Sequence, residues 1–304
     1  MAHYYGLPEK IEQVTTLLSD ENWCSSYVFH LRWPEGFICP FCGRHHPSMK
    51  PGRQFTCLDC GKSTSLTSGT LMHGSKKTLS DWLRAIWWLC GSTKRYHISE
   101  LQQMLHLGSY QTAWSWMRKL YCAMQLAEQQ TCKGPVEIDC STLSLPFNNN
   151  VTVSLVAVIE IRLTDWSTGR VRMAALGGLT PEAIEQFMEE AVKPGSVLFA
   201  PDKEPFRSIN CSSYLCAIER GRVFHDNLSA LFLQFKQWCS RRHQRLSSMA
   251  LLRKQIAEFS FYKNGTLCIS RQLLFEHLLR AILRHPPAPC HTLLAHPAES
   301  GGAA

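Results

Sequence analysis

Hydrophobic residues recur at helical spacing in three stretches of the chain. The clearest stripe begins near Asp226 or Asn227, and another follows Thr78 or Ser80, either of which can cap a helix. A further stripe lies within residues 1–30 and predicts a helical lead-in. The stripes consist of Ile11, Val14, Leu17 and Leu18; of Trp82, Leu83, Ile86, Trp87 and Leu89; and of Leu228, Leu231, Phe232, Phe235, Trp238 and Cys239.

Residues 96–124 have the pattern of two helices joined by a tight turn. The first helix is short and amphipathic, His106–Gly108 forms the turn, and Ser109 caps the second helix. In a helix-turn-helix the second helix enters the major groove of DNA, where its outward side chains reach bases and phosphates. Those outward residues are Gln111, Thr112, Ser115, Arg118 and Lys119. An ordinary helical hairpin is the alternative, because many have the same pattern.

From Gly134 the sequence changes to β-branched and apolar runs that are typical of strands. The predicted order is three strands, a helix, a strand, a variable stretch, a strand and a helix. Thr180 and Pro181 mark the helix start, because threonine caps a helix and proline suits its first turn. One aspartate, Asp139, directly follows the first strand, and Asp202 lies just past the fourth. The predicted strands cover residues 136–138, 151–161, 170–176, 197–200 and 223–225.

Two Cys-x-x-Cys pairs, Cys39/Cys42 and Cys57/Cys60, are separated by fourteen residues, and a glycine follows each pair. The permissive backbone of glycine lets the chain wrap around one ion. Four thiolates at this spacing predict a closed tetrahedral Zn²⁺ ribbon, which folds a segment too small to form its own core. The spacer is slightly short for this pattern, so a histidine of the His45–His46 pair is an alternative fourth ligand. Redox or disulfide chemistry is the other alternative.

The composition limits the class of protein. With 304 residues, 45% of them hydrophobic, the chain is long enough for two or three globular domains. No apolar run reaches eighteen residues, and residues 1–20 lack the pattern of a secretory signal, so we expect no membrane contact. The fourteen cysteines show no pairing pattern outside the two Cys-x-x-Cys motifs, which indicates free thiols in a reducing compartment, the cytosol.

The net charge of +8 gives a modest preference for polyanions. Its distribution is more informative, because six Lys or Arg residues and no acid lie between Asn227 and Ala257. Four of them, Lys236, Arg241, Arg242 and Arg245, fit contact with DNA phosphates, which would position DNA without reading its sequence. A solvated helix face is the alternative. The six are Lys236, Arg241, Arg242, Arg245, Arg253 and Lys254.

The positions of Asp139 and Asp202 are typical of a ribonuclease-H-like domain, in which carboxylates meet at neighbouring strand ends. Hard divalent cations prefer such oxygen ligands. Two of these ions about 4 Å apart can activate an attacking hydroxyl and stabilise the leaving oxygen in phosphoryl transfer. A surface carboxylate at a strand end is the alternative interpretation of Asp139.

Taken together, these segments resemble the zinc-ribbon DDE transposases of bacterial insertion sequences, the group with an ISXO-like DDE domain. The resemblance runs from about Trp33 to Asn264. It implies that the amino-terminal half recognises the terminal repeats of the element. The carboxy-terminal half would cut double-stranded DNA with Mg²⁺ or Mn²⁺ and join the free 3′ hydroxyl to a target. The shared motifs are CPFCG, CLDCG, SLTSGTLMHGSKKTLSDWLRAIWWL, GSYQTAWSWMRKL, GPVEID, KPGSVLFAPD, FKQWCSRRHQRLS and EFSFYKN.

The sequence departs from the family pattern beside both matched aspartates. The acidic residue expected after Asp139 is Cys140. The glycine and tryptophan expected after Asp202 are Lys203 and Glu204. Near the end of the resemblance, Tyr262 and Gly265 stand where the family has arginines.

The third catalytic position, glutamate or asparagine in this group, is not acidic here. It aligns with Gln234 if Lys236 is the anchor, or with Ser229 at the spacing of the other subgroup. Glutamine offers a neutral oxygen to a metal, as asparagine does. Asp226 and Glu258 are alternative acids, although an acid at a helix start is commonly a cap. The resemblance therefore leaves two hypotheses: a DDE transposase, with catalytic Asp139, Asp202 and Gln234, or a catalytically inactive transposase-derived DNA-binding protein.

The sequence thus predicts a multidomain α+β protein: a zinc ribbon and helix-turn-helix, then a ribonuclease-H-like α/β domain with a mixed sheet. The transposition reaction implies a homo-oligomer, because two element ends must be held together, and a cytoplasmic, nucleoid-associated location. The expected boundaries are 1–30 for the lead-in, 31–75 for the zinc ribbon, 76–133 for the helical DNA-binding region, 134–284 for the ribonuclease-H-like domain and 285–304 for a disordered tail.

Overall fold

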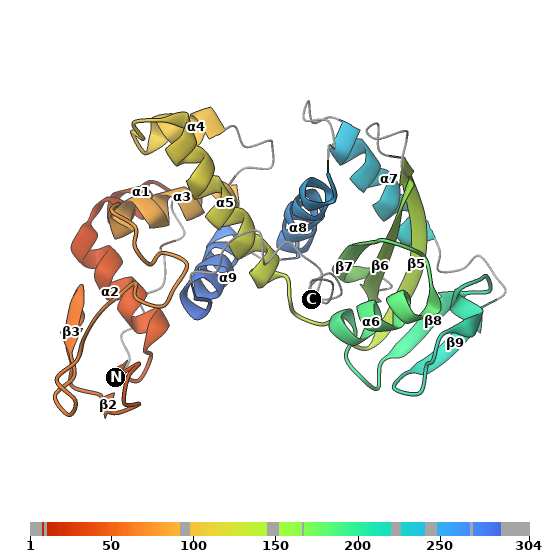
Figure 1. Ribbon diagram of the computed structural model, residues 1–304, viewed down its shortest axis with the longest axis horizontal. Coiled ribbons are helices and arrows are strands. Elements are labelled where there is room, and N and C mark those ends of the chain that lie inside the picture. Colours follow the sequence, from red (N-terminus) through yellow and green to blue (C-terminus); the bar gives the residue numbers. More distant parts are fainter. Residues whose placement is uncertain are drawn as a thin grey trace, which may run out of the picture. The chain divides into compact units, whose positions relative to one another are not determined.

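The computed structural model describes residues 8, 11–91, 98–144, 152–165, 167–219, 226–240, 248–267 and 270–286 (Figure 1). The chain divides into two compact units. Unit 1 comprises Met1–Ala127 and Ile269–Leu293, and unit 2 comprises Glu128–Cys268 and Leu294–Ala304. None of the helices in the described part is long and apolar enough to cross a membrane. The expected tail falls almost entirely outside the described residues.

Unit 1 combines helices with two small hairpins. The first two helices precede the hairpins, three follow them, and one returns from the far end of the chain. The helices are α1 (Ile11–Ser19), α2 (Glu21–Arg32), α3 (Leu79–Gly91), α4 (Ile98–Met104), α5 (Tyr110–Ala127) and α9 (Arg271–Arg284). The strands are β1 (Phe37–Ile38), β2 (His45–His46), β3 (Gln54–Thr56) and β4 (Ser63–Ser65), which pair antiparallel as β1–β2 and β3–β4.

An aromatic cluster joins the hairpins to α2. Phe37 of β1 and Phe55 of β3 stack with ring centroids 5.2 Å apart, and Trp33 meets both rings edge-on. The guanidinium of Arg32 donates hydrogen bonds to the carbonyl oxygens of Leu66 at 2.5 Å and Ser68 at 2.6 Å. The small hairpins therefore share a core with α2 instead of forming their own.

Helix α9 belongs to unit 1, whereas the sequence analysis assigned residues up to 284 to the second domain. Its apolar stripe packs against α2, α3 and α5. Phe275 lies within ring contact of Tyr27 and Trp87, and Arg271 covers the Trp87 ring at 4.0 Å. The apolar stripe predicts that one face of α9 is buried, but a periodic pattern does not show in which unit that face packs.

Unit 2 is built on a five-stranded mixed sheet in the order β7-β6-β5-β8-β9. The first three strands form an antiparallel meander, and β8 and β9 run parallel to β5 on its other side. Its elements are β5 (Pro135–Ser144), β6 (Thr152–Ile161), β7 (Thr168–Leu176), α6 (Pro181–Ala191), β8 (Val197–Pro201), a short 3-10 helix (Phe206–Ser208), β9 (Leu215–Glu219), α7 (Asp226–Ser240) and α8 (Met249–Gly265).

Both faces of the sheet are covered. Val136 and Ile138 of β5 face α6, whereas the alternate side chains of β6 and β7 pack with α7 and α8. Thr180 caps α6 as predicted, since its hydroxyl accepts a hydrogen bond from the Ala183 amide at 3.3 Å. Strand β9 lies in the stretch that the sequence analysis treated as variable. The strand expected at 223–225 lies outside the described residues.

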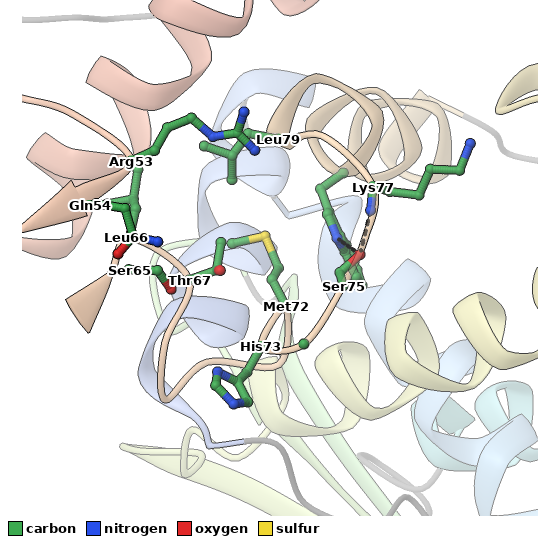
Figure 2. A pocket seen from close by; sticks show the side chains of 12 residues that line it. Arg53, Gln54, Ser65, Leu66, Thr67, Met72, His73, Ser75, Lys77 and Leu79 are labelled. Atoms are coloured by element: carbon green, nitrogen blue, oxygen red, sulfur yellow. Dashed lines mark hydrogen bonds between the residues drawn. The ribbon is translucent and has the colours of Figure 1, made fainter. Parts of the chain in front are cut away.

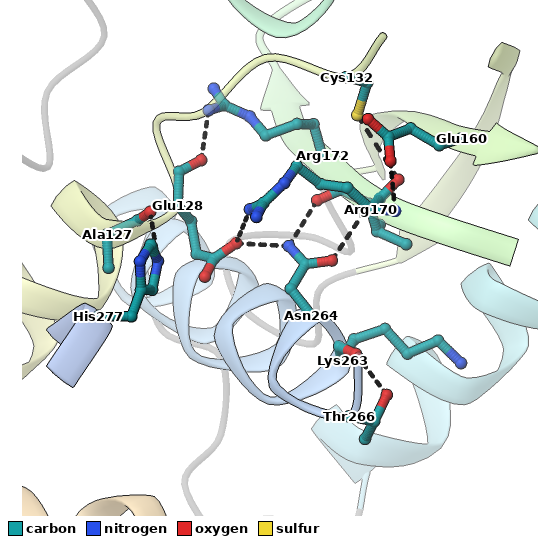
Figure 3. Close-up of polar contacts among 11 residues, drawn as sticks. Ala127, Glu128, Cys132, Glu160, Arg170, Arg172, Lys263, Asn264, Thr266 and His277 are labelled. Atoms are coloured by element: carbon teal, nitrogen blue, oxygen red, sulfur yellow. Dashed lines mark hydrogen bonds and ion pairs between the residues drawn. The ribbon is translucent and has the colours of Figure 1, made fainter. Parts of the chain in front are cut away.

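Asn264 of α8 closes the edge of the sheet at β7 (Figure 3). Its side chain accepts a hydrogen bond from the Val171 amide at 2.8 Å and donates one to the Val171 carbonyl at 2.9 Å. It also donates to the Glu128 carboxylate. Arg170 lies 3.3 Å from the same carboxylate, and Arg172 donates to the Glu128 carbonyl oxygen. The network fixes the chain where it enters unit 2.

Candidate functional site

The four cysteines of the ribbon converge at one point. The Sγ atoms of Cys39 and Cys60 lie 3.7 Å apart, and those of Cys42 and Cys57 lie 3.6 Å apart. All four sulfurs lie within 4.8 Å of one another. A tetrahedron with Zn–S bonds of about 2.3 Å separates its sulfurs by about 3.8 Å. The residues present therefore fit a structural Zn²⁺ ion.

The two cysteine turns have the same backbone geometry. Gly43 and Gly61 adopt φ angles of +71° and +68°, in the left-handed region that favours glycine. Their amides donate to the carbonyl oxygens of Cys39 and Cys57, each at 2.9 Å. Each turn thus presents both of its sulfurs to the same point.

The two histidines of β2 have different partners. Nε2 of His45 lies 2.8 Å from the carbonyl oxygen of Glu35, so this ring is held away from the sulfurs. Nε2 of His46 lies 3.3 Å from Cys57 Sγ. Because the four sulfurs already have tetrahedral separations, a histidine in place of one thiolate is not supported.

The family comparison agrees with this geometry. Residues 19–63 match the family model of the transposase zinc-ribbon domain. The matched segment contains α2, both cysteine turns and the start of β4. A search of curated proteins finds no match for the chain. The amino-terminal part of unit 1 is therefore a transposase zinc-ribbon domain with a four-cysteine metal site.

A cavity of about 510 Å³ lies between the zinc-ribbon domain and the start of α3 (Figure 2). Its walls come largely from the segment that follows the ribbon, which carries the SLTSGTLMHGSKKTL motif. Arg53 extends toward Leu79 in Figure 2, while the Lys77 side chain points away, and its ammonium donates to the Leu105 carbonyl at 3.1 Å. The lining residues are Arg53, Gln54, Ser65, Leu66, Thr67, Met72, His73, Gly74, Ser75, Lys77, Leu79 and Trp82.

Helices α4 and α5 lie where the sequence analysis placed the two helices of a helix-turn-helix. His106 in the connecting turn has a positive φ of 46°, and the Ser109 hydroxyl accepts a hydrogen bond from the Thr112 amide at 3.1 Å. The buried residues of α5 include Ala113, Trp116, Met117 and Leu120, the predicted inner face. Assignment of this pair as a DNA-binding motif stays a prediction.

Four of the five residues expected to face DNA are exposed, and one is not. Lys119 is half-buried, with its ammonium 5.7 Å from the centroid of the Trp82 ring. Burial lowers the pKa of Lys119. The sequence analysis did not identify Tyr110, which is 57% exposed at the start of α5. The exposed four are Gln111, Thr112, Ser115 and Arg118.

Asp139 and Asp202 come from neighbouring strands. The parallel register pairs Glu137 with Phe199, and its continuation places Asp139 level with Pro201, immediately before Asp202. Asp139 lies on the same face of β5 as Glu137 and Ser141, because residues two apart in a strand point to the same side. The side chains of Glu137 and Ser141 are hydrogen-bonded to Asn227 and Lys236 of α7, respectively. Strand β5 continues past Asp139 to Ser144, so Asp139 lies within the strand and not directly after it as predicted. It lies level with the end of β8, on the α7 side of the sheet.

Each of these aspartates is bound by a cation from the loop that follows β8. Nζ of Lys203 lies 2.6 Å from Oδ1 of Asp139, whose side chain is only 12% exposed. Nε of Arg207 donates to Oδ1 of Asp202 at 2.6 Å. This contact raises the pKa of Arg207. Lys203 stands where the resemblance described above led us to expect glycine, a residue that could not form such a contact.

The third candidate position also has a basic partner. Gln234 lies on α7, and its side-chain oxygen accepts a hydrogen bond from Nζ of Lys263 at 3.1 Å. The candidate positions thus hold two carboxylates and one amide, bound by three cationic groups. In this arrangement Lys203, Arg207 and Lys263 engage the side-chain oxygens that Mg²⁺ or Mn²⁺ would need as ligands.

The remaining DNA-binding and acidic candidates from the sequence analysis do not form one site in the described part of the chain. Nζ of Lys236 donates to the Ser141 hydroxyl at 3.0 Å, so this lysine binds the sheet. Glu258 is fully buried in α8, away from solvent. Arg241, Arg242 and Arg245, and the side chain of Asp226, lie outside what the structure describes.

Eleven cysteines in the described part of the chain form no disulfide, and four of these are the cysteines of the metal site. Cys122 of α5 is in a disulfide, so the expectation that all thiols outside the ribbon are free does not hold there.

Proposed function

We propose that this protein is a transposase-derived DNA-binding protein. Unit 1 binds double-stranded DNA through the zinc-ribbon domain and the exposed face of α5. Unit 2 keeps a ribonuclease-H-like sheet but does not cut DNA. The match of residues 19–63 to a transposase zinc-ribbon domain supports the relationship. The sheet order, with the first and fourth strands of unit 2 side by side, supports the ribonuclease-H-like assignment.

The ion pair between Lys203 and Asp139 is the main observation that supports a protein that does not cleave DNA. An ammonium 2.6 Å from a carboxylate that is largely shielded from water neutralises the charge that would attract a divalent ion. A metal ion would have to displace this ammonium and then remain beside it, with like charges close together. The same reasoning applies to Arg207 and Asp202. Metal-dependent catalysis by Asp139 and Asp202 would therefore require both ion pairs to break first.

A DDE transposase that cleaves and joins DNA is the second candidate. The observation that favours it is that β5, which carries Asp139, runs beside β8, which ends immediately before Asp202. Under this candidate the bound form of the protein would have to move Lys203 and Arg207 away. Recognition of terminal repeats and self-association on two DNA ends belong to both candidates, since binding the ends precedes cutting.

A binding and nicking experiment tests the proposal. The purified full chain is incubated with a labelled DNA duplex that carries the inverted repeats flanking its gene, in buffer without added divalent metal, with Mg²⁺ or with Mn²⁺. Binding is measured by fluorescence anisotropy and strand cleavage on denaturing gels. We expect salt-sensitive binding in all three conditions and no cleavage product. Metal-dependent cleavage that Asp139→Asn abolishes would establish the transposase instead. Absence of DNA binding would refute both candidates.

A further inference from the structure

His46 links the two halves of the zinc-ribbon domain. It lies on β2, beyond the first cysteine turn, and its ring reaches the second turn. Nε2 lies 3.3 Å from Cys57 Sγ and 3.3 Å from Oδ2 of Asp59. The ring stacks on Phe37 with centroids 5.9 Å apart, and only 11% of the side chain is exposed. His46 is therefore held in one orientation beside a zinc ligand.

The chemistry of the neighbours fixes the direction of the hydrogen bond. A zinc-bound cysteine is a thiolate and has no proton to donate. The ionised carboxylate of Asp59 also only accepts. Nε2 must therefore carry the hydrogen and donate it to Cys57 Sγ, while Asp59 stabilises the positive end of that N–H group.

This hydrogen bond has a consequence for the metal site. Four thiolates around one divalent ion carry excess negative charge, and the thiolate is the form that reacts with electrophiles. An N–H donor disperses part of the charge on Cys57. It also holds the sulfur at its tetrahedral position relative to the other cysteine turn.

We infer that His46, oriented by Asp59, is a positioning residue that retains zinc in this domain without being a ligand. The inference does not depend on DNA binding or cleavage. Groups that orient metal ligands typically change metal affinity by about 10-fold to 100-fold when they are removed. The size of the effect at His46 is expected in this range.

The adjacent His45 provides a matched control. It is the same residue type on the same strand, but its Nε2 lies 2.8 Å from the Glu35 carbonyl and not from a sulfur. A general effect of removing an imidazole from β2 would appear in both variants. An effect through the Cys57 thiolate would appear only at His46.

Zinc affinity of the full chain tests the inference. Competition with a chromogenic chelator would give the dissociation constant for the wild type, His46→Ala, His46→Gln, Asp59→Asn and His45→Ala. We expect His46→Ala to weaken zinc binding by about 10-fold to 100-fold. Glutamine keeps an N–H donor of similar reach, so His46→Gln is expected to lose less. Asp59→Asn should also lose less, and His45→Ala should match the wild type. Equal affinity for His46→Ala and His45→Ala would overturn the inference.

Cobalt substitution separates a positioning residue from a ligand. The visible absorption of Co²⁺ reports whether three or four sulfurs bind the ion. We expect the same four-sulfur spectrum for the wild type and His46→Gln, with faster loss of metal to a chelator from the variant. A spectrum of three sulfurs and one nitrogen in the wild type would show that His46 is itself a ligand and would overturn the inference. His46→Gln also keeps the test valid if His46→Ala does not fold.

Discussion

The ammonium of Lys203 lies 2.6 Å from the carboxylate of Asp139, one of the two aspartates that the sequence analysis proposed as metal ligands. Lys203→Ala would leave this mostly shielded carboxylate without its cation, so we expect a loss of about 1–3 kcal/mol in unfolding free energy. Millimolar Mn²⁺ should then raise the melting temperature of the variant and not that of the wild type. Thermal denaturation with and without Mn²⁺ measures both effects.

Lys193→Ala is the control for that experiment. Lys193 is an exposed lysine of the same unit, two residues past the end of α6. Its loss should leave the melting temperature unchanged. If Mn²⁺ raises the melting temperature of the wild type as much as that of Lys203→Ala, the ion pair does not exclude the metal ion. The transposase candidate would then gain support.

Removal of zinc should unfold the ribbon and release DNA. The hairpins have little apolar core beyond the Trp33, Phe37 and Phe55 cluster, and structural zinc supplies about 10–16 kcal/mol in isolated zinc fingers at neutral pH. We expect a zinc chelator to abolish the near-ultraviolet circular dichroism of this cluster together with DNA binding. Adding zinc back should restore both signals. Full DNA affinity after stoichiometric loss of zinc would contradict the prediction.

Arg118 and Lys119 are neighbours on α5 with different surroundings. Arg118 is exposed, whereas Lys119 is half-buried over Trp82. Arg118→Ala should weaken DNA binding about tenfold and reduce the slope of log affinity against log salt by about 1. Lys119→Met should preserve DNA affinity, because its amine is engaged with the ring. Anisotropy titrations at several salt concentrations distinguish them. Equal losses for the two variants would mean that α5 does not present this face to DNA.

Asn264→Ala should destabilise unit 2 strongly. The substitution removes both hydrogen bonds to the Val171 backbone and the one to Glu128, all of them buried. Unsatisfied buried groups cost about 1–3 kcal/mol each, so we expect a total loss of about 3 kcal/mol or more. Urea unfolding measures it. Asn210→Ala, which removes an exposed turn contact in the same unit, should cost less than about 1 kcal/mol. Similar losses for both would show that the Asn264 network contributes little.

Glu128 predicts a pH dependence of stability. Burial raises the pKa of Glu128 above its ordinary value of 4.5, against the opposing effects of Asn264 and Arg170. The folded state therefore binds the proton more tightly than the unfolded state. The resulting stabilisation is present below pH 4.5 and is lost as the pH rises through the raised value. Glu128→Gln should remove this dependence. The melting temperature of the variant should therefore rise relative to that of the wild type as the pH increases. Parallel curves for the two proteins from pH 4 to 8 would refute this.

Local signals in the sequence were sufficient for many elements. The cap at Thr180, the proline after it and the apolar stripe of α6 all lie within a few residues, so the helix could be predicted. The metal site could be predicted as well, because Cys-x-x-Cys spacing and the glycines dictate the turn geometry. Strand β9 was missed because its five residues show neither alternation nor a turn signal that distinguishes them from a loop.

Contacts between distant segments could not be predicted. The stripe of α9 does not reveal that it packs in unit 1. The order of strands predicted that the strands of Asp139 and Asp202 would be neighbours, and β5 and β8 do run side by side, although β5 extends past Asp139. Lys203 was visible as a departure from a pattern, but its role and that of Arg207 depend on how the loop after β8 turns back toward the sheet. His46 was considered as a ligand, and only the position of its ring shows the different role.

The pairing of Asn264 with Val171 also bears on association between molecules. Strand β7 is the outer strand of its sheet, and outer strands offer unpaired backbone groups to other chains. A single amide side chain from α8 occupies the donor and the acceptor of one residue there, as a neighbouring strand would. Loss of that side chain would therefore expose a template for strand addition, and the variant would become prone to aggregate.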